Sequence, residues 1–151
     1  MGGSYHRINL HIVFSTKNRY PFLQDTNLRN DLFAYSSKIL LNHGAFPIKI
    51  GGWIDHIHLL CLQSKNEFIS ETLRDLKIST SKWIKQNGGI STKFQWQRGF
   101  AVFSVSESLI PVVKKYIENQ ETHHRDKSFA EEYKKLLLKH NIKFDDKYLW
   151  D

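Results

Sequence analysis

The chain has 151 residues, which suits one domain of ordinary size and is too short for two well-packed ones. With 40% hydrophobic and 13% aromatic residues it can fill a core, and this composition excludes disorder as its main state. The single cysteine, Cys61, excludes an intramolecular disulfide and a multi-cysteine zinc site, which suits a reducing compartment. We therefore expect a single domain over residues 1–151.

The charge of the chain favours a polyanionic partner. Lys and Arg together number 22 against 15 Asp and Glu, which gives a net charge of +7. Nucleic acid is the leading candidate, and solubility is the alternative explanation of the excess charge. The longest apolar stretches fall far short of the ~20 residues of a membrane span, and the first residues lack the pattern of a secretory signal. We expect a cytoplasmic protein without membrane segments.

Apolar periodicity predicts a mixture of strands and helices. Alternation of apolar residues indicates strands, and apolar spacings of three and four residues indicate helices. Asp55 separates two strand-like runs, which predicts antiparallel neighbours joined by a tight turn or a bulge. Gly44 is expected to end the first helix, and Gly88 and Gly89 the second. The expected strands are 5–15, 46–54, 56–63 and 94–105, and the expected helices are 27–43 and 67–87.

The remainder of the chain has a helical pattern. Pro111 suits the first turn of a helix that runs to Gln120. Ser128 and Glu131 form a capping box before the apolar face of another helix, and the tail over 144–151 keeps enough apolar residues to dock on the body. The order of elements is that of the ferredoxin-like split βαβ fold. We therefore expect an α+β domain with a four-stranded antiparallel sheet and additional C-terminal helices.

Two pairs of residues could carry chemistry. His56 and His58 are two apart on an expected strand, so their side chains leave the same face and could share one metal ion. Half-buried structural histidines are the alternative explanation. Tyr116 and Gln120 are four apart on an expected helix and share a face, although a tyrosine at this spacing commonly belongs to a core. Neither pair alone identifies a site.

Taken together, the two pairs form a more specific pattern. His-Ile-His at 56–58, followed by Tyr-Ile-Glu-Asn-Gln at 116–120 in a small basic domain, resembles the IS200/IS605-type transposases. These are the single-tyrosine members of the HUH nuclease superfamily, and the related REP-associated tyrosine transposases share the pattern. The resemblance spans nearly the whole chain. It includes 11–19, 96–100, 102–106, and His123-His124-Arg125 followed by Phe129, Glu132 and Tyr133.

The resemblance implies cleavage and rejoining of single-stranded DNA at element ends that contain imperfect hairpins. It implies Tyr116 as the nucleophile and His56, His58 and Gln120 as ligands of a divalent metal ion, Mg²⁺ or Mn²⁺. Such an ion neutralises and orients the scissile phosphate, and the covalent product would be a 5′-phosphotyrosine with a free 3′-hydroxyl. In the resembled family the protein is a homodimer, and the helix of one subunit completes the histidine pair of the other.

Other residues are candidates for accessory roles. His124 would share the face of Tyr116 and Gln120 if their helix continued, as an alternative ligand or a phosphate contact, or it belongs to a solvated loop. Asp55 could orient His56, although a turn-forming role is the simpler explanation. Trp96, Phe100 or Tyr20 could stack on unpaired bases, with core packing the alternative for the first two. The basic candidates for DNA contacts are Lys17, Arg19, Arg74, Lys77, Lys82, Arg98 and Arg125.

Three alternative functions stay open at this point. A non-catalytic RRM-like module shares the split βαβ order, and residues 98–101 match the start of the RNP1 pattern, although on the fourth strand instead of the third. An HUH replication initiator or relaxase shares the chemistry but normally carries further domains. A domesticated transposase would have identical catalytic residues, and genomic context would separate it from a mobile one.

Overall fold

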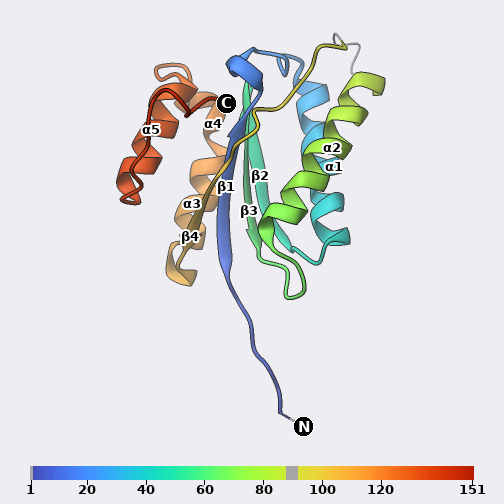
Figure 1. The fold of residues 1–151 in the computed structure, drawn as a ribbon, viewed down its shortest axis with the longest axis vertical. Coiled ribbons are helices and arrows are strands. Elements are labelled where there is room, and N and C mark those ends of the chain that lie inside the picture. Colours follow the sequence, from blue (N-terminus) through green and yellow to red (C-terminus); the bar gives the residue numbers. More distant parts are fainter. Residues whose placement is uncertain (1, 88–91) are drawn as a thin grey trace.

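A computed structural model describes residues 2–87 and 92–151 of the chain. Within these residues, four strands form one antiparallel sheet in the order β2-β3-β1-β4 (Figure 1). Helix α1 (Thr26–Asn42) connects β1 to β2, and α2 (Ile69–Asn87) connects β3 to β4, which confirms the predicted ferredoxin-like topology. The strands are β1 (Asn9–Ser15), β2 (Pro47–Trp53), β3 (His56–Leu62) and β4 (Ala101–Val105).

Helices cover both faces of the sheet. Helices α1 and α2 lie side by side on one face, and the C-terminal helices lie on the other (Figure 1). These are α3 (Ile110–Glu118), α4 (Gln120–His123) and α5 (Phe129–Lys139). Because both faces are covered, β1 is buried along its whole length and β3 along nearly all of it. No helix among the described residues is long and apolar enough to cross a membrane.

The pleat of the sheet divides the core into two clusters. Ile12 and Ile57 belong to the cluster under α1 and α2, whereas Val13 belongs to the cluster under α5. Successive residues of a strand point to opposite faces. The neighbours of Ile57, which are His56 and His58, therefore point toward the side of α3, α4 and α5.

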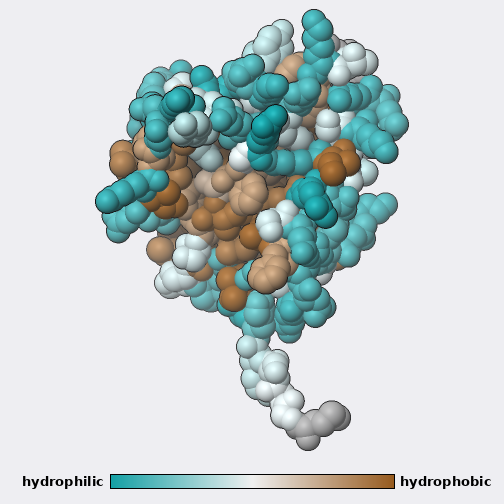
Figure 2. All heavy atoms as spheres, in the orientation of Figure 1, coloured by the Kyte–Doolittle hydropathy of each residue, from teal (hydrophilic) through white to brown (hydrophobic). Residues whose placement is uncertain are grey.

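Strands β2 and β3 lie within one residue of their predicted bounds, whereas β1 and β4 begin later than predicted. Strand β1 begins at Asn9, where Arg7 and Ile8 just before it still bond to Glu107 and Gln63, and the described N-terminal end of the chain extends away from the body (Figure 2). The fourth strand begins at Ala101 instead of 94, because Phe94 and Trp96 use their side chains to fill the core without joining the sheet ladder. Trp96 forms only an isolated bridge with Thr16. The buried aromatic residues give this irregular segment the composition of a strand, which is why the sequence predicts a strand that begins too early.

The predicted helix ending at Gln120 is divided. Helix α3 ends at Glu118, and α4 begins at Gln120, because Asn119 (φ −96°, ψ 16°) leaves the helical conformation. The turn at Asp55 and the cap at Ser128, whose side chain accepts a hydrogen bond from the Glu131 amide, agree with the prediction. The predicted stop at 88–89 lies outside the described residues.

The C-terminal tail docks on the body as predicted. Trp150 packs against Phe129 and Tyr133 of α5, with ring centroids 6.1 and 5.4 Å away. The carbonyl oxygen of Asp151 accepts hydrogen bonds from the amides of Arg98 and Gly99. The tail therefore ties α5 to the irregular segment that precedes β4.

Candidate active site

The two histidines lie on the central part of the sheet, beneath the C-terminal helices. His56 pairs with Ser15 of β1 and Trp53 of β2, and His58 pairs with Val13 and Gly51. Both imidazoles are fully buried, with an exposed fraction of 0%. Their ring centroids are 5.1 Å apart, so the pair can present nitrogen atoms to one shared point.

A glycine lets α3 approach this point. A Cβ at Gly51 would lie 2.7 Å from Cγ2 of Ile117 and 2.8 Å from its carbonyl oxygen. A larger residue there would push α3 away from β2, because real Cβ atoms do not approach other atoms so closely. The absence of a side chain at Gly51 therefore allows the neighbours of Ile117, including Tyr116, to lie over His58.

Tyr116 and Gln120 both reach the histidine pair. The side-chain oxygen Oε1 of Gln120 lies 2.7 Å from Nε2 of His56, and its Nε2 donates to Oε2 of Glu132 at 2.8 Å. The hydroxyl of Tyr116 donates to the same oxygen of Glu132. The break between α3 and α4 does not separate the two residues, which meet at one carboxylate.

Glu132, from the first turn of α5, lies at the centre of the site with an exposed fraction of only 2%. Its Oε1 lies 3.1 Å from Nε2 of His58 and 3.4 Å from Nε2 of His56. The same oxygen lies 3.0 Å from Nε2 of His124. Glu132 therefore contacts every one of the histidine, glutamine and tyrosine side chains expected to form the site.

The outer nitrogen of each central histidine also has a partner. Nδ1 of His56 lies 2.8 Å from Oδ1 of Asp55, and Nδ1 of His58 lies 2.8 Å from Nε2 of His11. Such contacts fix the orientation of a ligating imidazole and direct its other nitrogen inward. Asp55 also occupies the turn between β2 and β3, so its position is compatible with both explanations considered for it.

His124 belongs to the cluster and not to a solvated loop. Its Nε2 lies 3.0 Å from Oε1 of Gln120, and only 2% of its side chain is exposed. The neighbouring His123 lies nearer the surface, with Nε2 3.5 Å from Oε2 of Glu132. The short helix α4, together with its C-cap residue His124, therefore supplies three nitrogen- or oxygen-bearing side chains to one side of the site.

The electrostatics of the cluster centre on the carboxylate. Burial would raise the pKa of Glu132, but His58 and His124 outweigh it and hold this pKa well below its usual range. Burial, and then the charge of Glu132, raises the pKa of Tyr116 well above its ordinary value. Burial, with a smaller effect of His58, lowers the pKa of His11 to about 3. The site thus combines a charged carboxylate with a neutral phenol and a neutral outer imidazole.

The donor atoms suit a divalent cation. Two overlapping groups could hold one, His56 with His58 and Glu132, and His123 with His124 and Glu132, with all ligand atoms of each group within 4.8 Å of one another. The contacts of His56 with Gln120 and Glu132 measure 2.7 and 3.4 Å. Adjacent ligands of an octahedral ion at ~2.1 Å are about 3 Å apart, so this spacing fits. Imidazole nitrogen with amide and carboxylate oxygen suits Mn²⁺ well and Mg²⁺ less well.

The basic candidates lie in different surroundings. Lys17 and Arg98 line one cleft, and Lys82 and Arg98 line another; residues 95–98 line both. The guanidinium group of Arg19 packs over the Trp150 ring, with its carbon atom 4.0 Å from the ring centroid. Arg74 and Arg125 are exposed and line neither cleft.

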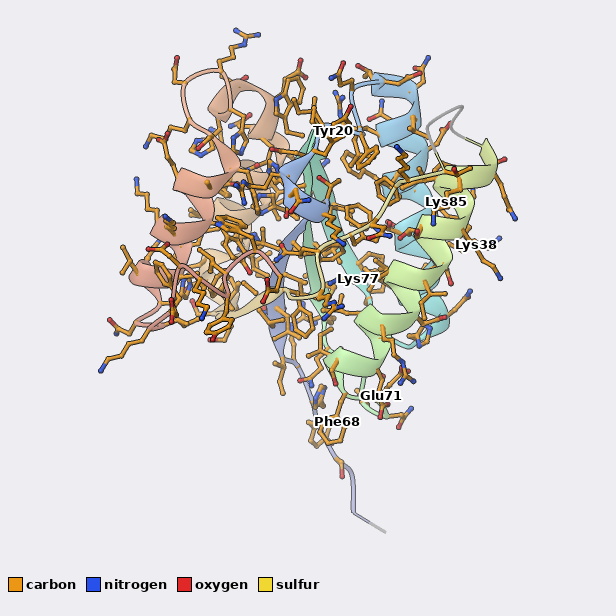
Figure 3. All side chains as sticks on the ribbon, turned by 45° about the horizontal axis from the view of Figure 1, so that its top comes forward. Tyr20, Lys38, Phe68, Glu71, Lys77 and Lys85 are labelled. Carbon is orange, nitrogen blue, oxygen red and sulfur yellow. The ribbon has the colours of Figure 1, made fainter. Side chains whose placement is uncertain are left out.

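Lys77 is held by the protein itself. Its ammonium group donates to the carbonyl oxygens of Gln97, Arg98 and Gly99 at 2.9, 3.1 and 2.8 Å. Figure 3 labels Lys77 and Lys85 at different levels of α2, and only Lys77 makes these contacts.

Of the stacking candidates, Trp96 is buried in the core, whereas Phe100 and Tyr20 are 37% and 59% exposed.

Comparison with known proteins identifies the family. Residues 4–120 match the model of the family described as "Transposase IS200 like", so the chain belongs to the IS200-like transposases. This assignment displaces the RRM-like and replication-initiator alternatives. A search of curated proteins finds no match to this sequence.

Solved structures share the fold at low sequence identity. One is a candidate transposase from Deinococcus radiodurans R1, with 21% identity and a TM-score of 0.61, covering 80% of this chain and 95% of that one. Another is a REP-associated tyrosine transposase bound to a REP hairpin, with 14% identity and a TM-score of 0.58, covering 82% of this chain and 73% of that one.

The central position of Glu132 and the role of His11 were not predicted from the sequence. Both residues fall in stretches that carry the family resemblance, but neither lies at helical or strand spacing from the histidine pair. Glu132 follows Gln120 by twelve residues and a turn, so only the packing of α5 brings it to the sheet. The Ser128 cap, which fixes where α5 begins, was the available signal.

Proposed function

We propose that this transposase cleaves and rejoins single-stranded DNA at hairpin-containing ends through a 5′-phosphotyrosine on Tyr116. The observation that carries the proposal is the convergence of Tyr116 and Gln120 on Glu132, directly over His56 and His58. A phenol, two imidazoles and an amide at one buried point combine a nucleophile with a cation site. The family assignment supports DNA strand transfer as the reaction class.

His56, His58 and Gln120 would hold the divalent ion, Mg²⁺ or Mn²⁺. When bound, such an ion polarises the scissile phosphate and offsets its charge. The imidazoles are oriented by Asp55 and His11, so their inner nitrogens are available without rearrangement of the strand. Because the two imidazoles and the amide are neutral, they leave the full positive charge of the ion to act on the phosphate.

Tyr116 supplies the attacking oxygen. Its hydroxyl donates to Oε2 of Glu132, the nearest group to which the proton can pass as the bond to phosphorus forms. The bond from phosphorus to the 3′ oxygen breaks, and this oxygen leaves as a 3′-hydroxyl after taking up the proton that Tyr116 released. A second 3′-hydroxyl can later attack the phosphotyrosine, releasing Tyr116 with its proton restored. The phosphodiester energy is kept, so no nucleotide cofactor is required.

The substrate is proposed to be a DNA hairpin with single-stranded flanks. One structural neighbour is bound to a REP hairpin, and the two basic clefts beside residues 95–98 offer Lys17, Lys82 and Arg98 to phosphates. Each phosphate that a cation neutralises releases counterions, so binding should weaken steeply with salt. Exposed Phe100 and Tyr20 are available for stacking on unpaired bases.

End labelling tests the proposed polarity. Hairpins drawn from DNA flanking the gene are labelled at either end and incubated with Mg²⁺ or Mn²⁺. A 5′-phosphotyrosine predicts that only the 3′-labelled strand migrates with the denatured protein, while the 5′-labelled fragment is released free. His58→Ala is the control, and it should give neither product. Label transfer from the 5′ end, or cleavage without a protein adduct, would overturn the proposal.

A further inference from the structure

The carboxylate of Glu132 lies among the donor atoms proposed to hold the ion. Its Oε1 is 3.1 Å from Nε2 of His58 and 3.4 Å from Nε2 of His56, spacings that adjacent ligands of one cation adopt. The residue comes from α5, beyond the stretch that matches the family model, which ends at residue 120. The family assignment therefore gives it no role.

Burial makes a purely structural role costly. Glu132 is 2% exposed, and a buried carboxylate loses its hydration unless charged or donor groups replace it. Four imidazoles and the Tyr116 hydroxyl surround it, whereas no lysine or arginine pairs with it among the ion pairs of the described residues. A divalent cation in the same cluster would offset the charge of the Glu132 carboxylate.

We propose that Glu132 is a further ligand of the divalent cation, binding it through Oε1 while Oε2 holds the Tyr116 hydroxyl. This inference rests on the proposed function, which places the cation at His56 and His58. A single carboxylate would then fix the distance between the nucleophile and the ion. The ligand set becomes two imidazoles, one amide and one carboxylate, which suits Mn²⁺ better than Mg²⁺.

The arrangement has a consequence for metal binding without DNA. A site of two imidazoles and an amide is neutral and depends on the DNA phosphate for anionic charge. With Glu132 the protein supplies one negative charge itself, so the ion can be held before the substrate arrives. The full chain should therefore bind Mn²⁺ in the absence of DNA, and this binding should depend on α5.

Titration of the full chain with Mn²⁺ tests the inference without any DNA. Free Mn²⁺ is followed by its electron paramagnetic resonance signal in the wild type, Glu132→Gln and Glu131→Gln. Glu131 is the matched control, because it is the adjacent residue of α5 and is exposed. Thermal unfolding of each variant establishes that it is folded. We expect Glu132→Gln to lower the Mn²⁺ affinity by about tenfold or more, and Glu131→Gln to leave it unchanged.

Wild-type affinity in a folded Glu132→Gln variant would overturn the proposal. If that variant does not fold, a crystal structure of the wild type with Mn²⁺ decides through the anomalous signal of the ion. Contact of the ion with Oε1 supports the proposal, and an ion bound to the histidines away from Glu132 overturns it. Failure of the proposed function is distinguishable, because it appears as a missing DNA adduct and leaves Mn²⁺ binding without DNA unaffected.

Discussion

Oε1 of Gln120 lies 2.7 Å from Nε2 of His56 in the same chain. Helix α4 thus reaches the histidine pair of its own sheet, supported by the close contact of Gly51 with Ile117. In the resembled family the corresponding helix completes the site of a partner subunit. A site assembled within one chain and a site shared between two subunits are therefore the two arrangements to distinguish.

Mixing two inactive variants separates the two arrangements. Tyr116→Phe lacks the nucleophile, and His56→Ala lacks a candidate metal ligand. A shared site would regain adduct formation on mixing, because one of the two sites in a mixed dimer would be intact. Assembly within one chain predicts that the mixture stays inactive. Recovery of adduct formation to an appreciable fraction of the wild type would contradict it.

Gly51→Ala should disturb the site from beneath. The added Cβ would lie 2.7 Å from Cγ2 of Ile117, so α3 must move outward and take Tyr116 with it. We expect the free energy of unfolding to fall by about 1–3 kcal/mol and adduct formation to drop with it. Chemical denaturation and the adduct assay measure the two effects. Gly99→Ala is the control, because its nearest contact would be an ordinary 3.7 Å; equal behaviour of the two variants would refute this account.

Removal of the Lys77 side chain should lower the free energy of unfolding, whereas removal of the Lys82 side chain should affect DNA binding. Lys77 donates to three backbone carbonyls before β4, so Lys77→Ala should lower the free energy of unfolding by about 1–3 kcal/mol. Lys82 is exposed beside the cleft that contains Arg98. Lys82→Ala should leave stability unchanged and reduce the salt dependence of hairpin binding by about one counterion. Denaturation and binding at several salt concentrations check the contrast, and a stability loss confined to Lys82→Ala would reverse the assignment.

A pH-dependent contribution to stability is expected at His43. Hydrogen bonds to Glu67 and Asp75 raise the pKa of His43 above its ordinary value. The protonated ring is favoured by folding, so its contribution is full below about pH 6.5 and is lost as pH rises through the raised value. His43→Gln should therefore cost up to about 1 kcal/mol near pH 6 and less near pH 9. Urea denaturation at both values tests this, and a larger cost at the higher pH would show that the sign is wrong.

The fold could be predicted from the sequence where periodicity and turn residues agreed. The paired strands around Asp55 and the cap at Ser128 are local features, and both occur as predicted. The segment before β4 was predicted wrongly as strand, because Phe94 and Trp96 carry the aromatic composition of a strand but pack into the core from an irregular backbone. Aromatic composition indicates that a segment is buried, but it does not indicate that the backbone of this segment forms the hydrogen bonds of a sheet.

The candidate site was predictable only where its residues are close in sequence. His56 with His58, and Tyr116 with Gln120, are pairs whose spacing places them on one face of an element. His11 and Glu132 reach the same point through strand pairing and helix packing. No local spacing encodes such contacts, because they depend on the register of β1 with β3 and on where α5 docks.

The most direct test of the central claim is adduct formation by the wild type and Tyr116→Phe on the same hairpin pool with Mg²⁺ or Mn²⁺. The account predicts a metal-dependent, denaturant-resistant protein–DNA adduct with the wild type and none with Tyr116→Phe, although the variant still binds the hairpin. An adduct that persists in Tyr116→Phe would contradict the role of this residue. Tight hairpin binding by the wild type without any adduct, with either ion, would contradict the catalytic assignment.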